Sequence, residues 1–97
     1  MSKKPNLNEV DMELGKLIRE YRLKLDMSQK ELATKLGYSQ PVFVSLLENG
    51  GSRVPLQTLG ELIVLLSIPE KKVTKILLDS YALRVRAEIV QGKKKRA

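Results

Sequence analysis

The sequence contains no cysteine and no histidine, and aromatic residues make up only 4% of its 97 positions. Without these two residue types it can form no disulfide, no thiolate or imidazole metal site and no Ser-His or Cys-His nucleophile pair. No apolar run approaches the roughly 18 residues of a membrane span. The lysines near the start are not followed by an apolar segment, so we expect no secretory signal. These absences predict a cytoplasmic protein without a metal or organic cofactor.

The residues that are present, 42% hydrophobic and 30% charged, are typical of one soluble globular domain. The net charge of +7 is concentrated at the two ends of the chain. Lys3, Lys4 and residues 93–96 supply six of the 18 basic residues, which leaves twelve against eleven acidic ones elsewhere. A positive charge suits a polyanionic partner, although short lysine-rich ends often confer only solubility.

Five segments carry apolar residues at the spacings of three and four that amphipathic helices show. We expect Asn8 and Ser39 to cap the first and third segments. Ser28 and Glu31 form a capping-box pattern at the start of the second, and Gly37 supplies its left-handed end. The five segments span residues 9–25, 28–36, 40–48, 55–68 and 70–91.

No stretch alternates with the period of a β-strand, so the fold class is predicted to be all-α. We expect a flexible N-terminal segment over residues 1–8, a helical domain over residues 9–91 and a basic, disordered tail over residues 92–97.

The stretch from Ser28 to Gly50 predicts two short helices joined by a tight turn, which is the architecture of helix-turn-helix DNA binding. Gly37 lets the chain reverse, and a small residue at Ala33 lets the helices cross closely. Val44 and Leu47 seat the second helix on the core. The other face of that helix is then free to enter a DNA major groove.

These residues resemble the Cro/repressor-type (Xre-like) helix-turn-helix regulators of bacteria and phages. The resemblance covers roughly residues 14–68 and implies a five-helix, lambda repressor-type domain with an extended C-terminal helix. It rests on several short elements in the family's order: Ile18-Arg19-Glu20-Tyr21-Arg22, Met27-Ser28-Gln29, Glu31-Leu32-Ala33, Leu36-Gly37, Val44-Ser45, Glu48-Asn49-Gly50 and Pro55.

The resemblance also implies roles for individual residues. Arg22 and Glu48 match a structural ion pair that joins the first helix to the end of the third. The candidate DNA phosphate contacts are Gln29, Ser39, Ser45, Asn49 and Arg53. Taken singly, each of these five is more often an ordinary surface or capping residue.

The base-reading candidates are Gln40, Val42, Phe43 and Leu46, an unusually apolar set. Gln40 can bond to adenine through two hydrogen bonds, and Val42 and Phe43 can pack against thymine methyl groups. Phe43 is equally well explained as a core residue. The spacing from Gly37 to Glu48 is one residue longer than the commonest family pattern, and the extra residue is expected within residues 38–42.

The last segment, residues 70–91, carries apolar residues on two nearly opposite sides. One side holds Val73, Ile76, Leu83, Ala87 and Val90, and the other holds Leu77, Leu78, Tyr81, Val85 and Ile89. One stripe suffices to dock a helix on its own domain, so the second needs another cover. We therefore expect a two-fold partner to cover the distal half, with Tyr81, Val85, Ile89, Leu83 and Val90 as interface candidates.

The function favoured by the sequence is a homodimeric, sequence-specific regulator of transcription, most simply a repressor that binds a palindromic double-stranded operator. An antitoxin that represses its own operon and holds a toxin is an alternative, as is a protein–protein adaptor that kept the fold. A protein partner such as a toxin or an antirepressor is compatible with the first two functions. No Gly-rich phosphate loop or evident carboxylate pair is present, so we expect no enzyme.

Overall fold

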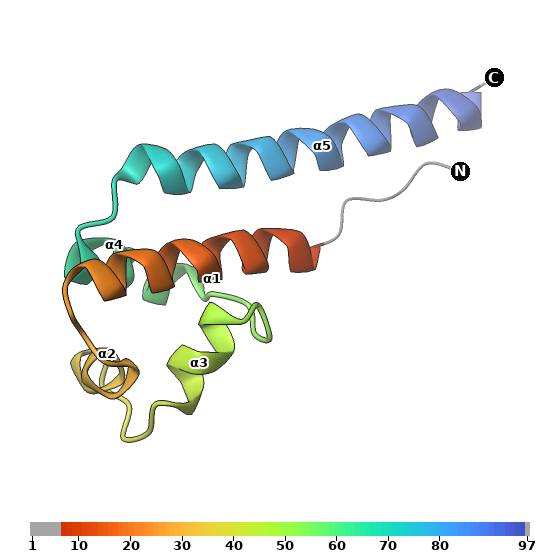
Figure 1. Ribbon diagram of the computed structural model, residues 1–97. Helices are drawn as coiled ribbons and strands as arrows, with labels where there is room; N and C mark the ends of the chain where they lie inside the picture. Colours follow the sequence, from red (N-terminus) through yellow and green to blue (C-terminus); the bar gives the residue numbers. More distant parts are fainter. Residues whose placement is uncertain (1–6, 97) are drawn as a thin grey trace.

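The computed structural model describes the backbone of residues 7–96 and the side chains of residues 9–96. All regular structure in this part of the chain is helical, which confirms the predicted all-α class. Figure 1 shows the five helices, in chain order α1 (Leu7–Lys24), α2 (Gln29–Lys35), α3 (Val42–Glu48), α4 (Leu56–Leu66) and α5 (Glu70–Arg96).

Helix α1 is the centre of the arrangement. It contacts α3, α4 and α5, whereas α2 reaches the rest of the domain mainly through α3. Figure 1 shows α5 running beside α1 in the opposite direction, with α2 and α3 on the other side of α1. The helix-turn-helix pair and the long C-terminal helix are therefore separated by α1.

The core is aliphatic and draws on every helix. Its largest completely buried side chains belong to leucine, isoleucine and valine. Apolar residues spaced three and four positions apart along each helix predict such a core. The buried hydrophobic residues are Leu14, Leu17, Ile18, Leu32, Ala33, Val44, Leu47, Leu59, Leu62, Leu66, Ile68 and Val73.

A hydrogen bond of 2.9 Å from Lys72 Nζ to the Tyr21 hydroxyl joins the start of α5 to the end of α1. This bond raises the pKa of Lys72, which is exposed. Because the pKa is raised in the folded state, any stability that the charged form contributes is present at neutral pH and lost only in strongly alkaline solution.

The ends of the helical domain differ from the sequence predictions. Helix α1 already begins at Leu7, so Asn8 lies within the helix and does not cap it. Residues 1–6 of the predicted flexible segment lie outside the described residues. Helix α5 does not stop near Gln91 but continues to Arg96, so residues 92–96 are helical and not disordered. Lysine and arginine are good helix formers, and their charge is favourable at a helix C-terminus.

Helix α5 is about 40 Å long at 1.5 Å per residue, and it extends well beyond the core. Val73 is its only buried residue in the described part of the chain, and Ile76 and Leu77 are half-buried against the core. The molecule consequently measures 55 × 24 × 19 Å. None of the helices within residues 7–96 combines the length and hydropathy needed to cross a membrane.

Candidate nucleic-acid interface

Helix α2 begins with the predicted capping box. The backbone N–H of Glu31 donates to Ser28 Oγ at 3.0 Å, and the backbone N–H of Ser28 donates to Glu31 Oε1 at 3.3 Å. Gly37 has a φ of 89° just after the helix, in the left-handed region that favours glycine. Tyr38 N–H then donates to the Ala33 carbonyl at 2.8 Å, which closes the end of α2 as predicted.

The turn between α2 and α3 spans residues 36–41. Helix α3 begins at Val42, so the predicted start near residue 40 is wrong by two positions. The N-cap position belongs to Pro41, without a side-chain cap, and Ser39 does not cap the helix as expected. Gln40 consequently lies in the exposed turn before α3, next to the first turn of the helix.

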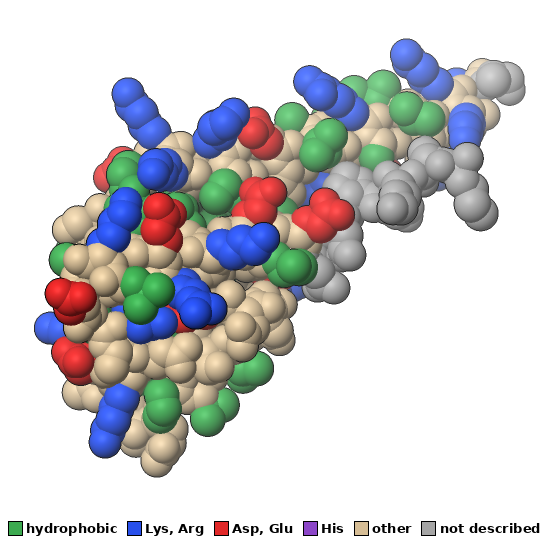
Figure 2. Space-filling view, in the orientation of Figure 1, with side chains coloured by type: hydrophobic (Ala, Val, Ile, Leu, Met, Phe, Trp, Pro, Cys, Tyr) green, Lys and Arg blue, Asp and Glu red, His purple; other side chains and the backbone are tan. Residues whose placement is uncertain are grey.

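Helix α3 has two faces of opposite character. Val44 and Leu47 are completely buried, and Glu48 is only 7% exposed, so this side packs into the domain. Val42 and Leu46 are 63% and 43% exposed on the other side. Ser45 is half-buried and Asn49, directly after the helix, is exposed, with Asn49 Nδ2 lying 3.5 Å from Ser45 Oγ. Figure 2 shows hydrophobic side chains at the edge of the molecule formed by α3 and the turn before it.

Phe43 lies on the flank of α3 between these two faces. It is half-buried and packs against the core, and its ring contacts the Tyr38 ring at a tilt of 46°, with a centroid distance of 4.5 Å. This position fits the packing interpretation of Phe43 better than base reading. The apolar periodicity of a helix of only seven residues does not distinguish a core residue from a base-reading residue at position 43, because a position on the flank of the helix is compatible with both roles.

The predicted ion pair between Arg22 and Glu48 is present. Arg22 Nε donates to Glu48 Oε2 at 2.6 Å and Arg22 Nη2 donates to Glu48 Oε1 at 3.0 Å, so both carboxylate oxygens are used. Arg22 Nη1 donates to the Met27 carbonyl at 2.7 Å. A buried pair of this kind fixes the end of α3 against the end of α1.

Gln29 joins this network, which the sequence did not predict. Its Nε2 donates to Glu48 Oε1 at 3.1 Å, and its side chain is half-buried. One hydrogen of the Gln29 side-chain amide is thus donated to a partner within the protein. The amide has a second hydrogen, so the bond to Glu48 orients the group without excluding a further acceptor.

Two glycines permit the close approach of α3 to α1, and neither role is among those predicted from the sequence. A Cβ on Gly15 would overlap the backbone carbonyl oxygens of Leu47 and Glu48. Gly50 has a φ of 71°, and a Cβ there would lie 2.6 Å from Met12 Cγ. A glycine in the middle of a helical apolar pattern was the available signal for Gly15, since glycine weakens a helix unless close packing requires it.

The charge near this surface is unevenly distributed. Residues 36–52, which include the turn and all of α3, contain no lysine or arginine. Arg53 follows in the loop before α4, where it is exposed and lines a groove with Asp11 and Arg84. Of the five predicted phosphate contacts, Arg53 alone lines this groove.

The comparisons with known proteins agree with this geometry. A helix-turn-helix family model of the Cro/C1 (Xre-like) type matches residues 18–73, which is more than half of the chain. The chain belongs to this family. Members of the Cro/C1-type helix-turn-helix family are DNA-binding regulators of transcription, and the matched region contains both helices of the motif. No curated protein and no solved structure matches the chain.

Proposed function

We propose that this Cro/C1-type protein is a homodimeric repressor that reads the major groove of a specific double-stranded DNA site with α3 and the turn before it. The observation that carries the proposal is the exposure of Val42 and Leu46 on a helix whose opposite face is completely buried. A helix seated in this way presents one face to a partner, and a major groove is wide enough to admit it.

The base-reading residues of this proposal are Gln40, Val42 and Leu46, and Phe43 supports them from the flank of the helix. Gln40 is exposed in the turn, where its amide can form the bidentate contact with adenine. Val42 and Leu46 offer methyl groups that match the thymine methyl. Specificity then depends largely on apolar contacts and on DNA shape.

Phosphate contacts come from the polar residues around this apolar face. Gln29, Ser39, Ser45 and Asn49 supply uncharged donors, and Arg53 is the cationic candidate. Contacts of this kind fix the position of the protein on the duplex and carry no sequence information by themselves. Because four of the five are uncharged, they contribute little to the release of counterions on binding.

Dimerisation would bring two copies of α3 to successive major grooves about 34 Å apart on one side of the DNA. The support for a dimer is the exposed apolar surface of α5, where Leu83, Val85 and Ile89 are 53%, 39% and 51% exposed. A two-fold dimer predicts a palindromic operator.

Selection of preferred duplexes from a random pool tests this function. We expect an enriched palindrome with half-sites one helical turn apart, and we expect Gln40→Ala to relax the preference at particular base pairs by about 1–3 kcal/mol. The Lys71→Ala variant, on the exposed first turn of α5, is the matched control and should leave the preference unchanged. A pool that shows no enrichment would overturn the proposal.

A protein–protein adaptor remains the second candidate, because an apolar α3 surface without lysine or arginine in residues 36–52 also suits a protein partner. The adaptor predicts no DNA affinity at any salt concentration. A DNA binder instead loses affinity linearly with log salt, with a slope near −0.9 for each phosphate neutralised. A salt titration of affinity for mixed-sequence duplex DNA therefore separates the two.

A further inference from the structure

A groove lies between α1, α5 and the loop that leads into α4, and it has a volume of about 430 Å³. Small-molecule sites occupy about 300–1,000 Å³, are mainly apolar and hold a few polar groups that converge on the ligand. Helix α3 contributes no residue to this groove, and neither do Leu83, Val85 and Ile89 of the proposed dimer contact. The groove is therefore available to a ligand of its own.

The walls of the groove are apolar over most of their length. The buried core residues Leu14 and Leu59 line it, together with the half-buried Leu77. Leu56 and Tyr81 also line it and are 82% and 64% exposed. Water thus covers apolar surface that the body of a ligand would bury, and such burial is the main source of affinity for an apolar compound.

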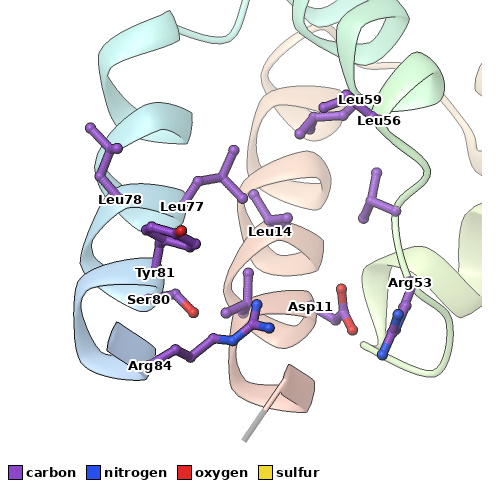
Figure 3. A pocket seen from close by; sticks show the side chains of 12 residues that line it. Asp11, Leu14, Arg53, Leu56, Leu59, Leu77, Leu78, Ser80, Tyr81 and Arg84 are labelled. Carbon is purple, nitrogen blue, oxygen red and sulfur yellow. The ribbon is translucent and has the colours of Figure 1, made fainter. Parts of the chain in front are cut away.

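The two ends of the groove differ in polarity. Figure 3 shows Asp11, Arg53 and Arg84 towards one end, whereas leucine side chains occupy the other. The three charged side chains come from α1, from the loop before α4 and from α5, respectively. A compound with a charged head and an apolar body matches this division.

The charged end has an excess of one positive charge. Arg53 and Arg84 are exposed, and among the side chains of residues 9–96 neither guanidinium forms an ion pair with a carboxylate. Asp11 supplies one negative charge beside these two positive ones. One further carboxylate makes this end neutral, and guanidinium groups bind carboxylates through paired hydrogen bonds. A doubly charged head would instead leave an excess of negative charge next to Asp11.

We infer that the groove binds an apolar monocarboxylic acid. Its carboxylate lies at the end that holds Arg53 and Arg84, and its hydrocarbon body lies along Leu14, Leu59 and Leu77. At about 30 Å³ for each non-hydrogen atom, the volume of a water molecule in the liquid, a compound of about a dozen such atoms fills most of the groove. Decanoate has this size and chemistry, and we use it as the probe.

The ligand has a consequence for DNA binding, and this step rests on the proposed function. Arg53 is the cationic candidate among the predicted phosphate contacts, so a carboxylate at this end of the groove competes with a DNA phosphate for its guanidinium. Ligand and DNA then weaken each other's binding by the same factor, because the coupling between two sites is reciprocal. The groove would thus connect the concentration of an organic acid to occupancy of the operator.

Isothermal titration calorimetry of the full chain without DNA tests the site. We expect saturable binding of one decanoate per chain. Butanoate, with a shorter body, and decyltrimethylammonium, with a positive head, should each bind about tenfold more weakly or less. Absence of decanoate binding would overturn the inference, and so would equal binding of decyltrimethylammonium.

Substitutions test the two ends of the groove separately. Arg84→Ala should weaken decanoate binding about tenfold, as expected for loss of a hydrogen bond to a charged group. Arg86→Ala is its matched control, because Arg86 is exposed on the same helix but does not line the groove. Leu56→Gln should weaken binding about threefold through lost apolar contact. Its control is Val64→Gln, at a position of α4 that is 78% exposed and outside the groove.

All four side chains are exposed, so each variant should fold, and thermal unfolding checks this. Unchanged affinity in Arg84→Ala or in Leu56→Gln would overturn the inference, as would an equal loss in the control variants. Chemical-shift changes in NMR spectra locate the probe. They should be largest at residues that line the groove, and changes confined to the apolar face of α3 would contradict the proposed site.

The effect on DNA is measured with the selected operator and saturating decanoate. We expect the affinity of the wild type for DNA to fall, with a salt slope lower by about 1 as one phosphate contact is lost. Arg84→Ala should bind DNA like the wild type but no longer respond to decanoate. Failure of the wild type to bind DNA without decanoate would count against the proposed function alone. DNA affinity unchanged by decanoate would overturn the coupling through Arg53.

Discussion

The carboxylate of Glu48 at the end of α3 accepts two hydrogen bonds, of 2.6 and 3.0 Å, from the guanidinium of Arg22 near the end of α1. Both residues are 7% exposed, and Gln29 at the start of α2 donates a third hydrogen bond to the same carboxylate. One buried acidic group thus ties together the three helices that position the exposed face of α3. The orientation of the proposed DNA-reading surface depends on this group.

Removal of either charge alone should destabilise the protein strongly, because the other charge is left buried without its partner. We expect Arg22→Met or Glu48→Leu to lower the free energy of unfolding by about 3–5 kcal/mol. The double variant should recover much of this loss, since it buries no uncompensated charge. Urea denaturation of the four proteins measures the coupling, and single variants as stable as the wild type would contradict the role of the pair.

The close contact between α1 and α3 should depend on Gly15. Gly15→Ala places a methyl group against the Leu47 and Glu48 carbonyl oxygens, so we expect a loss of at least about 2 kcal/mol of stability, as for other overpacked cores. Gly60→Ala in α4 is the matched control, because its Cβ meets nothing within 4 Å. That variant should gain up to about 1 kcal/mol from helix propensity. Thermal unfolding distinguishes the two, and equal effects would refute the steric explanation.

Val42 and Phe43 are neighbours with different expected roles. Val42→Ala removes exposed methyl groups, so the melting temperature should change little while discrimination at one base pair falls by about 1 kcal/mol. Phe43→Ala removes a half-buried ring, so unfolding should become easier by about 2 kcal/mol, roughly half the cost at a fully buried site. Binding and melting experiments on both variants provide the comparison. A specificity change confined to Phe43→Ala would reverse these assignments.

Substitution of Gln29 and of Arg53 should have different effects on the salt dependence of DNA affinity. Gln29→Ala should weaken binding to all duplexes alike with the salt slope unchanged, because an uncharged amide releases no counterion. Arg53→Ala should also weaken binding to all sequences, but it should reduce the slope by about 1. Affinity measured at several salt concentrations tests both. An unchanged slope in Arg53→Ala would mean that Arg53 serves the groove beside Asp11 and not the DNA.

The basic end of α5 should act only through its charge. Figure 1 places this end far from α3, and residues 93–96 continue the helix. Deletion of residues 93–97 should therefore lower DNA affinity mainly at low salt and leave the selected sequence unchanged. Altered base preference in the truncated protein would contradict this expectation.

Local sequence signals predicted most of the helical framework. The capping box of Ser28 and Glu31 and the left-handed Gly37 mark the two ends of α2 correctly, because these interactions involve residues within a few positions of each other. The start of α3 is not fixed by such a signal, since Pro41 can stand either within the first turn of a helix or just before it, and the structure places it just before. The resemblance to the family correctly paired Arg22 with Glu48 across 26 residues of sequence, which no local pattern specifies.

The amino-acid sequence by itself determined that the chain is helical, where its apolar faces lie and which regulator family it resembles. Only the tertiary structure decided that Phe43 turns towards Tyr38, that Gln29 bonds to Glu48 and that α5 leaves the core after its first turns. The physical reason is that helix formation depends on neighbours within about four residues. Exposure, in contrast, depends on which distant segments pack against each other, and here the approach of α3 to Gly15 on α1 sets that arrangement.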